Sequence, residues 1–299
     1  MNASGIGTLF VVATPLGNRQ DLSPRAAELL RTAPVIAAED TRTARRLLAE
    51  LGVTLGERRL LSCFDANEAG RATELAAALR AGTDVVLVSE AGTPLLSDPG
   101  FRVVAAAIAA GARVVPVPGP SAVLAALVGA GLPTDQFVFL GFPSRKSGAR
   151  RRLFESVRAL PFTLVFYESP MRTGDTLDDL AAVLGGRRPA CVARELTKEH
   201  EEFVRGTLAS LAAQYKDDRP LGEITLVVSG ADATVDDGAG EDDLAARADA
   251  LLVAGKSARD VADYLAAVTG RPRREIYQLV LKRQADAGDG DSNDDGAGD

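Results

Sequence analysis

Short apolar runs alternate with helix-like segments through the first part of the chain, and no other feature of the sequence constrains the fold as strongly. Each run is typical of a buried strand, and each is followed by a polar loop and a segment of helical character. The expected strands are residues 8–14, 35–38, 84–89 and 113–117. Strands that are joined through helices run in the same direction, so the pattern predicts an α/β fold built on a mostly parallel sheet.

The alternation continues beyond residue 132 and predicts a second α/β domain. Its expected strands are residues 137–140, 163–167, 190–193 and 223–228. A chain of 299 residues is long enough for about two domains of ordinary size. The expected segments are an N-terminal α/β domain over 1–132, a C-terminal α/β domain over 133–231, an acidic linker over 232–243, a small helical segment with a helix-turn-helix pattern over 244–285, and a disordered acidic tail over 286–299.

The negative charge of the chain is concentrated in two short stretches. The formal net charge is −7, and residues 232–243 and 286–299 carry six acidic residues each and no lysine or arginine. Removing these twelve negative charges changes the balance from −7 to +5. A mildly basic body is compatible with an RNA partner, and equally with ordinary solvated faces.

The residue types present exclude several classes of protein. No apolar run approaches the roughly 20 residues of a membrane span, so no membrane partner is expected. The single histidine, His200, and the absence of a Cys-x-x-Cys pair exclude a histidine-rich or cysteine-rich metal site, so no metal is expected. Cys63 and Cys191 lie far apart in strand-like runs, which is typical of buried thiols in the reducing cytoplasm.

Unusual loops follow the expected strands of the first domain. The loop Val88-Ser-Glu-Ala-Gly-Thr-Pro-Leu-Leu-Ser-Asp-Pro-Gly100 contains two glycines, two prolines and two carboxylates. Glycine lets the backbone approach a ligand closely, and proline reduces the entropy that is lost when a loop is held open. The other loops at this edge are residues 14–18, 39–42 and 118–122. Ligands of open parallel sheets bind beyond the carboxyl ends of the strands, so this edge is the candidate site.

Six motifs resemble, in their order along the chain, those of the tetrapyrrole methylase superfamily. They occupy residues 13–18, 38–42, 88–100, 117–121, 166–169 and 193–197. The resemblance covers roughly residues 9–230 and is closest to the branch of the superfamily that modifies ribosomal RNA. It implies a two-domain class III methyltransferase fold, S-adenosylmethionine bound in a cleft between the two domains, and a homodimer.

The ribosomal branch methylates the ribose 2′-oxygen of a cytidine in the decoding centre of 16S rRNA, so the resemblance implies this activity and the small ribosomal subunit as partner. In porphyrin-modifying relatives the motif at Ala91-Gly-Thr-Pro94 reads Gly-Gly-Asp-Pro, and Thr93 replaces that aspartate here. This departure disfavours a tetrapyrrole substrate. Two alternatives stay open, a methyltransferase that acts on a tetrapyrrole and a non-catalytic RNA-binding assembly factor.

The resemblance also implies a set of cofactor-binding residues. Those expected from the first domain, on the methionine side, are Pro15, Ala91, Gly92, Thr93, Leu96, Ser121 and Ala122. Those expected near the adenine and ribose, from the second domain, are Tyr167, Leu196 and Thr225.

A ribose hydroxyl has a high pKa, so transfer of a methyl group to it needs in-line approach and a proton acceptor. We expect Asp98 to be that base or to orient the hydroxyl, with Glu39 and Asp40 as the next candidates. The alternative role of Asp98 is a helix cap before Pro99-Gly100-Phe101.

Two groups of basic residues are candidates for binding RNA phosphate, because guanidinium groups bind it through paired donors. Arg42 follows the second strand, and Lys146, Arg150 and Arg151 lie in Arg145-Lys-Ser-Gly-Ala-Arg-Arg-Arg152, whose serine and glycine indicate an exposed loop. A solvated helix face is the alternative. With four tyrosines, ten phenylalanines and no tryptophan, we expect shape and phosphate contacts to outweigh stacking on aromatic rings.

Overall fold

The computed structural model describes residues 5–216, 222–231, 241–269 and 272–289. Contacts divide the chain into two compact units. The first unit consists of Met1–Gly129 and Ala193–Glu202, and the second consists of Ala130–Val192 and Phe203–Asp299. Ala193–Glu202 therefore belongs to the first unit, although it follows most of the second unit in the sequence.

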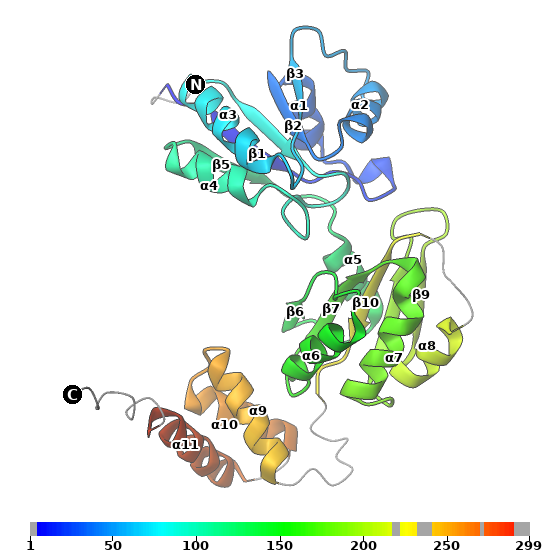
Figure 1. The fold of residues 1–299 in the computed structure, drawn as a ribbon, viewed down its shortest axis with the longest axis vertical. Coiled ribbons are helices and arrows are strands. Elements are labelled where there is room, and N and C mark those ends of the chain that lie inside the picture. The colour runs from blue at the N-terminus through cyan, green and yellow to red at the C-terminus, as the bar shows by residue number, and fades with distance from the viewer. Residues whose placement is uncertain (1–4, 217–221, 232–240, 270–271, 290–299) are drawn as a thin grey trace, which may run out of the picture. The chain divides into compact units, whose positions relative to one another are not determined.

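The first unit is built on a five-stranded sheet with the order β3-β2-β4-β1-β5 (Figure 1). Every neighbouring pair in this sheet is parallel, which confirms the predicted direction of the strands. The strands are β1 (Thr8–Val12), β2 (Val35–Ala38), β3 (Arg59–Ser62), β4 (Val85–Val88) and β5 (Arg113–Val117). The helical elements are η1 (Arg19–Asp21), α1 (Pro24–Thr32), α2 (Thr41–Glu50), α3 (Glu68–Arg80), α4 (Phe101–Ala109) and α5 (Ala122–Ala130), the last of which runs into the second unit.

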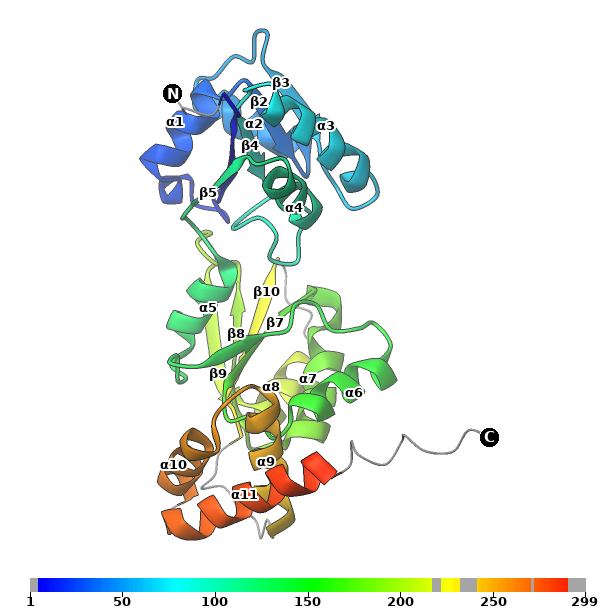
Figure 2. The same ribbon diagram turned by 90° about the vertical axis from the view of Figure 1, so that its left-hand side faces the viewer.

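Helices cover both faces of this sheet, as Figures 1 and 2 show. Val85 and Leu87 of β4 pack in one hydrophobic cluster with α3 and α4, whereas Val86 and Val88 pack in a second cluster with α1 and α2. All four residues of β4 are buried, which is why the sequence of the strand is a continuous apolar run without polar alternation.

The second unit has a five-stranded mixed sheet with the order β6-β7-β10-β8-β9, in which β7 pairs parallel with β6 and antiparallel with β10. Phe154 and Phe166 meet edge to face in its core, with ring centroids 5.5 Å apart. The strands are β6 (Phe137–Phe139), β7 (Thr163–Glu168), β8 (Pro189–Arg194), β9 (Glu202–Thr207) and β10 (Ile224–Val228). The helical elements are α6 (Ser147–Val157), η2 (Pro170–Arg172), α7 (Thr173–Leu184) and α8 (Leu208–Tyr215).

Three helices follow, α9 (Glu241–Val253), α10 (Ala258–Thr269) and α11 (Arg273–Asp289), and they enclose a hydrophobic cluster of their own (Figure 2). Arg283 of α11 pairs with Asp249 of α9 and joins the last helix to the first. Most of the expected acidic linker, residues 232–240, lies outside the described residues, and so does 290–299 of the expected tail. In the described part of the chain no helix is long and apolar enough to span a membrane.

Gly7 makes the closest backbone approach at the start of β1. Its N–H group donates to the carbonyl oxygen of Leu79 at 2.8 Å, and a Cβ atom at this position would lie 2.2 Å from the carbonyl oxygen of Thr83. Both neighbouring atoms belong to the backbone, which cannot move aside as a flexible side chain can. Position 7 therefore requires glycine for β1 to lie against the end of α3.

We expect Gly7→Ala to lower the urea-unfolding free energy by about 1–3 kcal/mol, because the added methyl group must displace backbone. The matched control is Gly70→Ala in α3, where a Cβ would meet no atom within 4 Å. That variant should gain about 0.5–1 kcal/mol from the higher helix propensity of alanine. Similar effects of the two substitutions would show that the approach of Gly7 to Thr83 does not control stability.

Candidate active site

Hydrogen bonds join the loops at the carboxyl ends of the first unit's strands. Thr14, after β1, and Gly92, after β4, exchange two backbone hydrogen bonds of 2.9 and 3.0 Å. The hydroxyl of Thr93 donates to the carbonyl oxygen of Pro120, after β5, at 2.9 Å. The N–H of Glu90 donates to the carboxylate of Glu39, after β2, at 3.1 Å. The structure thus brings together the loops that the sequence placed at this edge.

The loop after β4 has an unusual backbone. Gly92 has a φ of 75°, and a Cβ there would lie 3.0 Å from the side chain of Leu16. Leu95 and Ser97 also have positive φ values, 74° and 69°, although they carry side chains. Such conformations cost on the order of 1–3 kcal/mol each and persist where the surrounding structure holds them, often at functional sites. The exposed Leu96 lies between them.

Two buried hydroxyl groups at this edge have no hydrogen-bond partner, Thr14 Oγ1 and Ser121 Oγ. An unsatisfied buried hydroxyl costs about 1–3 kcal/mol, so a native protein rarely keeps one without a reason. Helix α5 begins at Ala122, directly after Ser121, and the N–H groups of its first turn point away from the helix without intrahelical acceptors. A ligand with polar and anionic groups would satisfy these donors and hydroxyls.

Asp98 is the most perturbed carboxyl group of this loop. Burial, with the negative charge of Glu39 as the second cause, raises its pKa to about 7, although Ser89 donates a hydrogen bond to it. Burial also raises the pKa of Glu39. Because the pKa of Asp98 in the folded state is above its ordinary value, its ionisation costs folding stability as the pH rises through about 7. A carboxyl group kept under this cost is typical of a functional site.

The structure overturns the alternative role of Asp98 as a helix cap. The N-cap residue of α4 is Gly100, and Glu68 supplies the capping oxygen from the start of α3. Glu68 Oε1 accepts hydrogen bonds from the N–H groups of Gly100 at 2.9 Å and Arg102 at 2.8 Å. Sequence reasoning missed this residue, since Glu68 at the start of a helix gives no signal that it caps another helix.

Asp40, the other candidate base, caps a helix instead. Its carboxylate accepts a 2.7 Å hydrogen bond from the N–H of Arg42 at the start of α2. The Arg42 guanidinium also donates to this carboxylate, and these bonds lower the pKa of Asp40 to about 2. So acidic a group is a weak proton acceptor. The guanidinium of Arg42 is itself 90% exposed and accessible to a phosphate.

The expected adenosine-binding residues come from both units. Tyr167 and Thr225 are register partners on the antiparallel strands β7 and β10 of the second unit, so their side chains share one face of the sheet. Leu196 was expected from the second domain, but it lies in the part of the first unit contributed by Ala193–Glu202. There Thr197 Oγ1 accepts a 3.1 Å hydrogen bond from the N–H of Asn18, which joins this segment to the loop after β1.

The expectation of an exposed loop around Arg145–Arg152 is wrong from residue 147 on, because α6 begins at Ser147. Arg150 is 3% exposed, and its guanidinium pairs with the buried carboxylate of Asp179 in α7. It cannot present its charge to RNA. Arg151 also pairs with Asp179 but keeps 53% of its side chain exposed, and Lys146 is exposed at the N-cap position.

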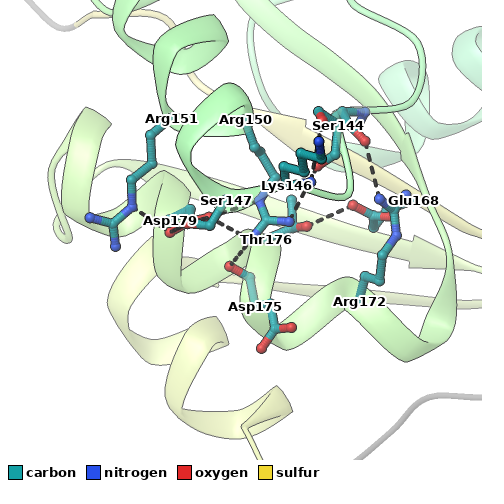
Figure 3. Close-up of polar contacts among 11 residues, drawn as sticks. Ser144, Lys146, Ser147, Arg150, Arg151, Glu168, Arg172, Asp175, Thr176 and Asp179 are labelled. Atoms are coloured by element: carbon teal, nitrogen blue, oxygen red, sulfur yellow. Dashed lines mark hydrogen bonds and ion pairs between the residues drawn. The ribbon is translucent and has the colours of Figure 1, made fainter.

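Asp179 is the centre of a polar network that Figure 3 shows. Ser147 Oγ donates to its carboxylate at 2.9 and 3.1 Å, and the guanidinium groups of Arg150 and Arg151 donate at 2.8 and 2.6 Å. Burial alone would raise the pKa of Asp179, but the hydrogen bonds from Arg151, Ser147 and Arg150 outweigh it and hold the pKa below its ordinary value. Serine and arginine in residues 145–152 therefore serve packing as well as the surface.

Comparisons with known proteins agree with this architecture. A family model described as tetrapyrrole (corrin/porphyrin) methylases matches residues 8–212. The ribosomal RNA small subunit methyltransferase I of Synechocystis sp. is 44% identical over 281 residues, which cover 94% of this chain and 100% of that protein. The protein of the same name from Mycobacterium tuberculosis is 45% identical and is covered to 97%, with 94% of this chain aligned. Among the described residues, no group of acidic, histidine or cysteine side chains could hold a metal ion.

Solved structures share the fold at lower identity. Uroporphyrin-III C-methyl transferase from Thermus thermophilus, complexed with S-adenosyl homocysteine, aligns with a TM-score of 0.53 and 23% identity over 74% of this chain and 97% of that one. Diphthine synthase aligns with a TM-score of 0.54 and 17% identity over 75% of this chain and 90% of that one. The family model covers more than half of the chain, and relatives more than 40% identical span nearly all of it. The chain belongs to the tetrapyrrole methylase family.

Proposed function

We propose that this protein is an S-adenosylmethionine-dependent methyltransferase that acts on 16S rRNA of the small ribosomal subunit, at the ribose 2′-oxygen of a decoding-centre cytidine. The observation that carries the proposal is 44–46% identity, along more than nine-tenths of the chain, to proteins named ribosomal RNA small subunit methyltransferase I. A tetrapyrrole substrate is the alternative, and Thr93, in place of the aspartate of porphyrin-modifying relatives, disfavours it.

The donors and hydroxyls of the candidate site suit the methionine part of the cofactor. The unpaired hydroxyls of Thr14 and Ser121 would bind its amino and carboxylate groups, and the N-terminus of α5 at Ala122 would favour the carboxylate. Gly92 lets the backbone approach, beside Pro15, Ala91, Thr93 and Leu96. Tyr167, Thr225 and Leu196 would bind the adenosine part. When bound, the cofactor supplies a methyl group that its sulfonium already activates.

Asp98 would accept the proton of the ribose hydroxyl. A base works best when its pKa is near the pH at which the enzyme operates, and the pKa of Asp98 is about 7. Glu39 contributes by raising this pKa through its charge, and the hydrogen bond from Ser89 orients the carboxylate. Arg42, Lys146 and Arg151 would contact RNA phosphate from exposed positions, whereas Arg150 has no part in this contact because it is buried.

The experiment that tests the function is transfer of labelled methyl from S-adenosylmethionine to small ribosomal subunits that lack the modification, with naked 16S rRNA and a tetrapyrrole beside them. Label on the ribose of one cytidine of the subunit is the expected result. Label on the tetrapyrrole alone would establish the alternative substrate. Absence of label from every acceptor would leave an RNA-binding assembly factor as the function.

We expect the kcat of the wild-type enzyme to rise about tenfold per pH unit below pH 7 and to level off above it, because Asp98 must be ionised to accept a proton. Asp98→Asn should lower kcat by about 10²-fold or more and lose this rise. Single-turnover rates between pH 5.5 and 9 measure both effects. The control is Asp40→Asn, which keeps a good helix cap and should keep the wild-type profile. Persistence of the rise in Asp98→Asn would assign the base to another group.

We expect Ser121→Ala to weaken binding of S-adenosylhomocysteine by about 5- to 30-fold, the loss that corresponds to one hydrogen bond of ~1–2 kcal/mol. The ligand-free protein should not lose stability, because the hydroxyl that is removed has no partner there. Titration calorimetry and thermal unfolding with and without ligand measure the two effects. Unchanged affinity, or lower stability of the ligand-free protein, would show that the Ser121 hydroxyl serves the fold.

A further inference from the structure

Residues 141–146, which we name the clasp loop, connect β6 to α6 and are held by two arginines from below (Figure 3). The guanidinium of Arg172 donates to the carbonyl oxygen of Pro143 at 3.1 Å. The guanidinium of Arg150 donates to the next carbonyl oxygen, that of Ser144, at 3.4 Å. Two consecutive peptide groups of the clasp loop are therefore fixed by side chains from different helical elements.

Each of these guanidinium groups is oriented by a buried carboxylate. Arg172 pairs with Glu168, whose side chain is fully buried and also accepts a 2.6 Å hydrogen bond from the hydroxyl of Thr176. Arg150 pairs in the same way with Asp179. A buried ion pair is costly to break, because removal of one partner leaves an uncompensated charge. The backbone of the clasp loop is thus rigid before any partner arrives.

The rigid clasp loop presents an aromatic ring and two cations to solvent. Pro143 is buried, but Phe142 remains 57% exposed, with its ring tilted against that of Tyr167 at a centroid distance of 5.3 Å. Arg145 and Lys146 are exposed, and within the described part of the chain neither pairs with a carboxylate. An exposed ring beside free cations is the combination by which proteins bind single-stranded nucleic acid.

We propose that Phe142 is a platform on which an unpaired base of the substrate RNA stacks, while Arg145 and Lys146 hold the adjoining phosphates. This inference rests on the proposed function, because it names the part of the protein that positions the RNA. A single ring bordered by cations favours a nucleotide over an apolar protein surface, which would need a wider apolar patch. Phe142 also touches Tyr167, so a stacked base would lie close to a candidate cofactor residue. Stacking then contributes more to RNA binding than the low number of aromatic residues suggests.

The test compares Phe142→Leu and Phe142→Tyr in the full-length protein, with binding to unmethylated small ribosomal subunits and to naked 16S rRNA as the readout. Phe142→Leu keeps apolar bulk but cannot stack, and it should weaken binding to both about 5- to 150-fold, the range for one base on an aromatic ring at ~1–3 kcal/mol. Phe142→Tyr should retain wild-type binding. The slope of log affinity against log salt should not change in either variant, because no charge is altered.

Controls separate this idea from its rivals. Phe137→Leu alters another partly exposed ring, at the opposite end of β6 from the clasp loop, and should leave RNA binding unchanged. Arg145→Gln with Lys146→Gln should reduce the salt slope by about 0.7 for each charge removed. Affinity for S-adenosylhomocysteine should stay at the wild-type value in Phe142→Leu.

Three results would overturn the proposal. Equal RNA affinity of Phe142→Leu and wild type would remove the platform. A parallel loss of S-adenosylhomocysteine affinity would mean that Phe142 acts through Tyr167. Loss of binding to the subunit alone, with naked 16S rRNA bound normally, would identify a ribosomal protein as the partner. Methyl transfer by the wild-type protein is measured in the same samples, so failure of the platform is distinguished from failure of the enzyme function.

Discussion

The reciprocal hydrogen bonds between Thr14 and Gly92 are the constraint on which the candidate site depends. They make the loops after β1 and β4 into a short antiparallel pair beyond the end of a parallel sheet. Once these two loops are fixed, Thr93 reaches Pro120, and the unpaired hydroxyls of Thr14 and Ser121 lie in loops that are linked to one another. The positive φ of Gly92 is necessary for this arrangement, since its position leaves no room for a Cβ beside Leu16.

The two units use charge in opposite ways. In the first unit, Asp98 and Glu39 are buried near each other without an arginine between them, so the pKa of each is raised and Asp98 can exchange a proton near neutral pH. In the second unit, Asp179 is buried against arginines, so its pKa is lowered and it stays ionised. Its contribution to stability is therefore present above the ordinary carboxyl range and is lost as the pH falls below it. The first arrangement suits chemistry, and the second suits rigidity.

The sequence predicted the central strands and the edge where the loops gather, because these depend on local patterns. Strand β4 is buried on both faces and is apolar throughout. The strands that were missed, β3 and β9, are at sheet edges and begin with the charged residues Arg59 and Glu202, so their apolar signal is weak. Glu68 and Asp179 could not be assigned either. Each acts on groups about 30 residues away in the sequence, at Gly100 and Arg150, which no local pattern reveals.

The discontinuous composition of the first unit sets an order for its assembly during synthesis. The acceptor for the N–H of Asn18 is Thr197, 179 residues further along the chain. A ribosome that has just completed Gly129 has released every strand of the first sheet, but not the segment Ala193–Glu202 that completes the unit. The loop after β1 must therefore wait for most of the second unit to be translated before it acquires its last contacts. Completion of the first unit is thereby coupled to translation of the second, and nascent chains released in between lack a finished cofactor edge.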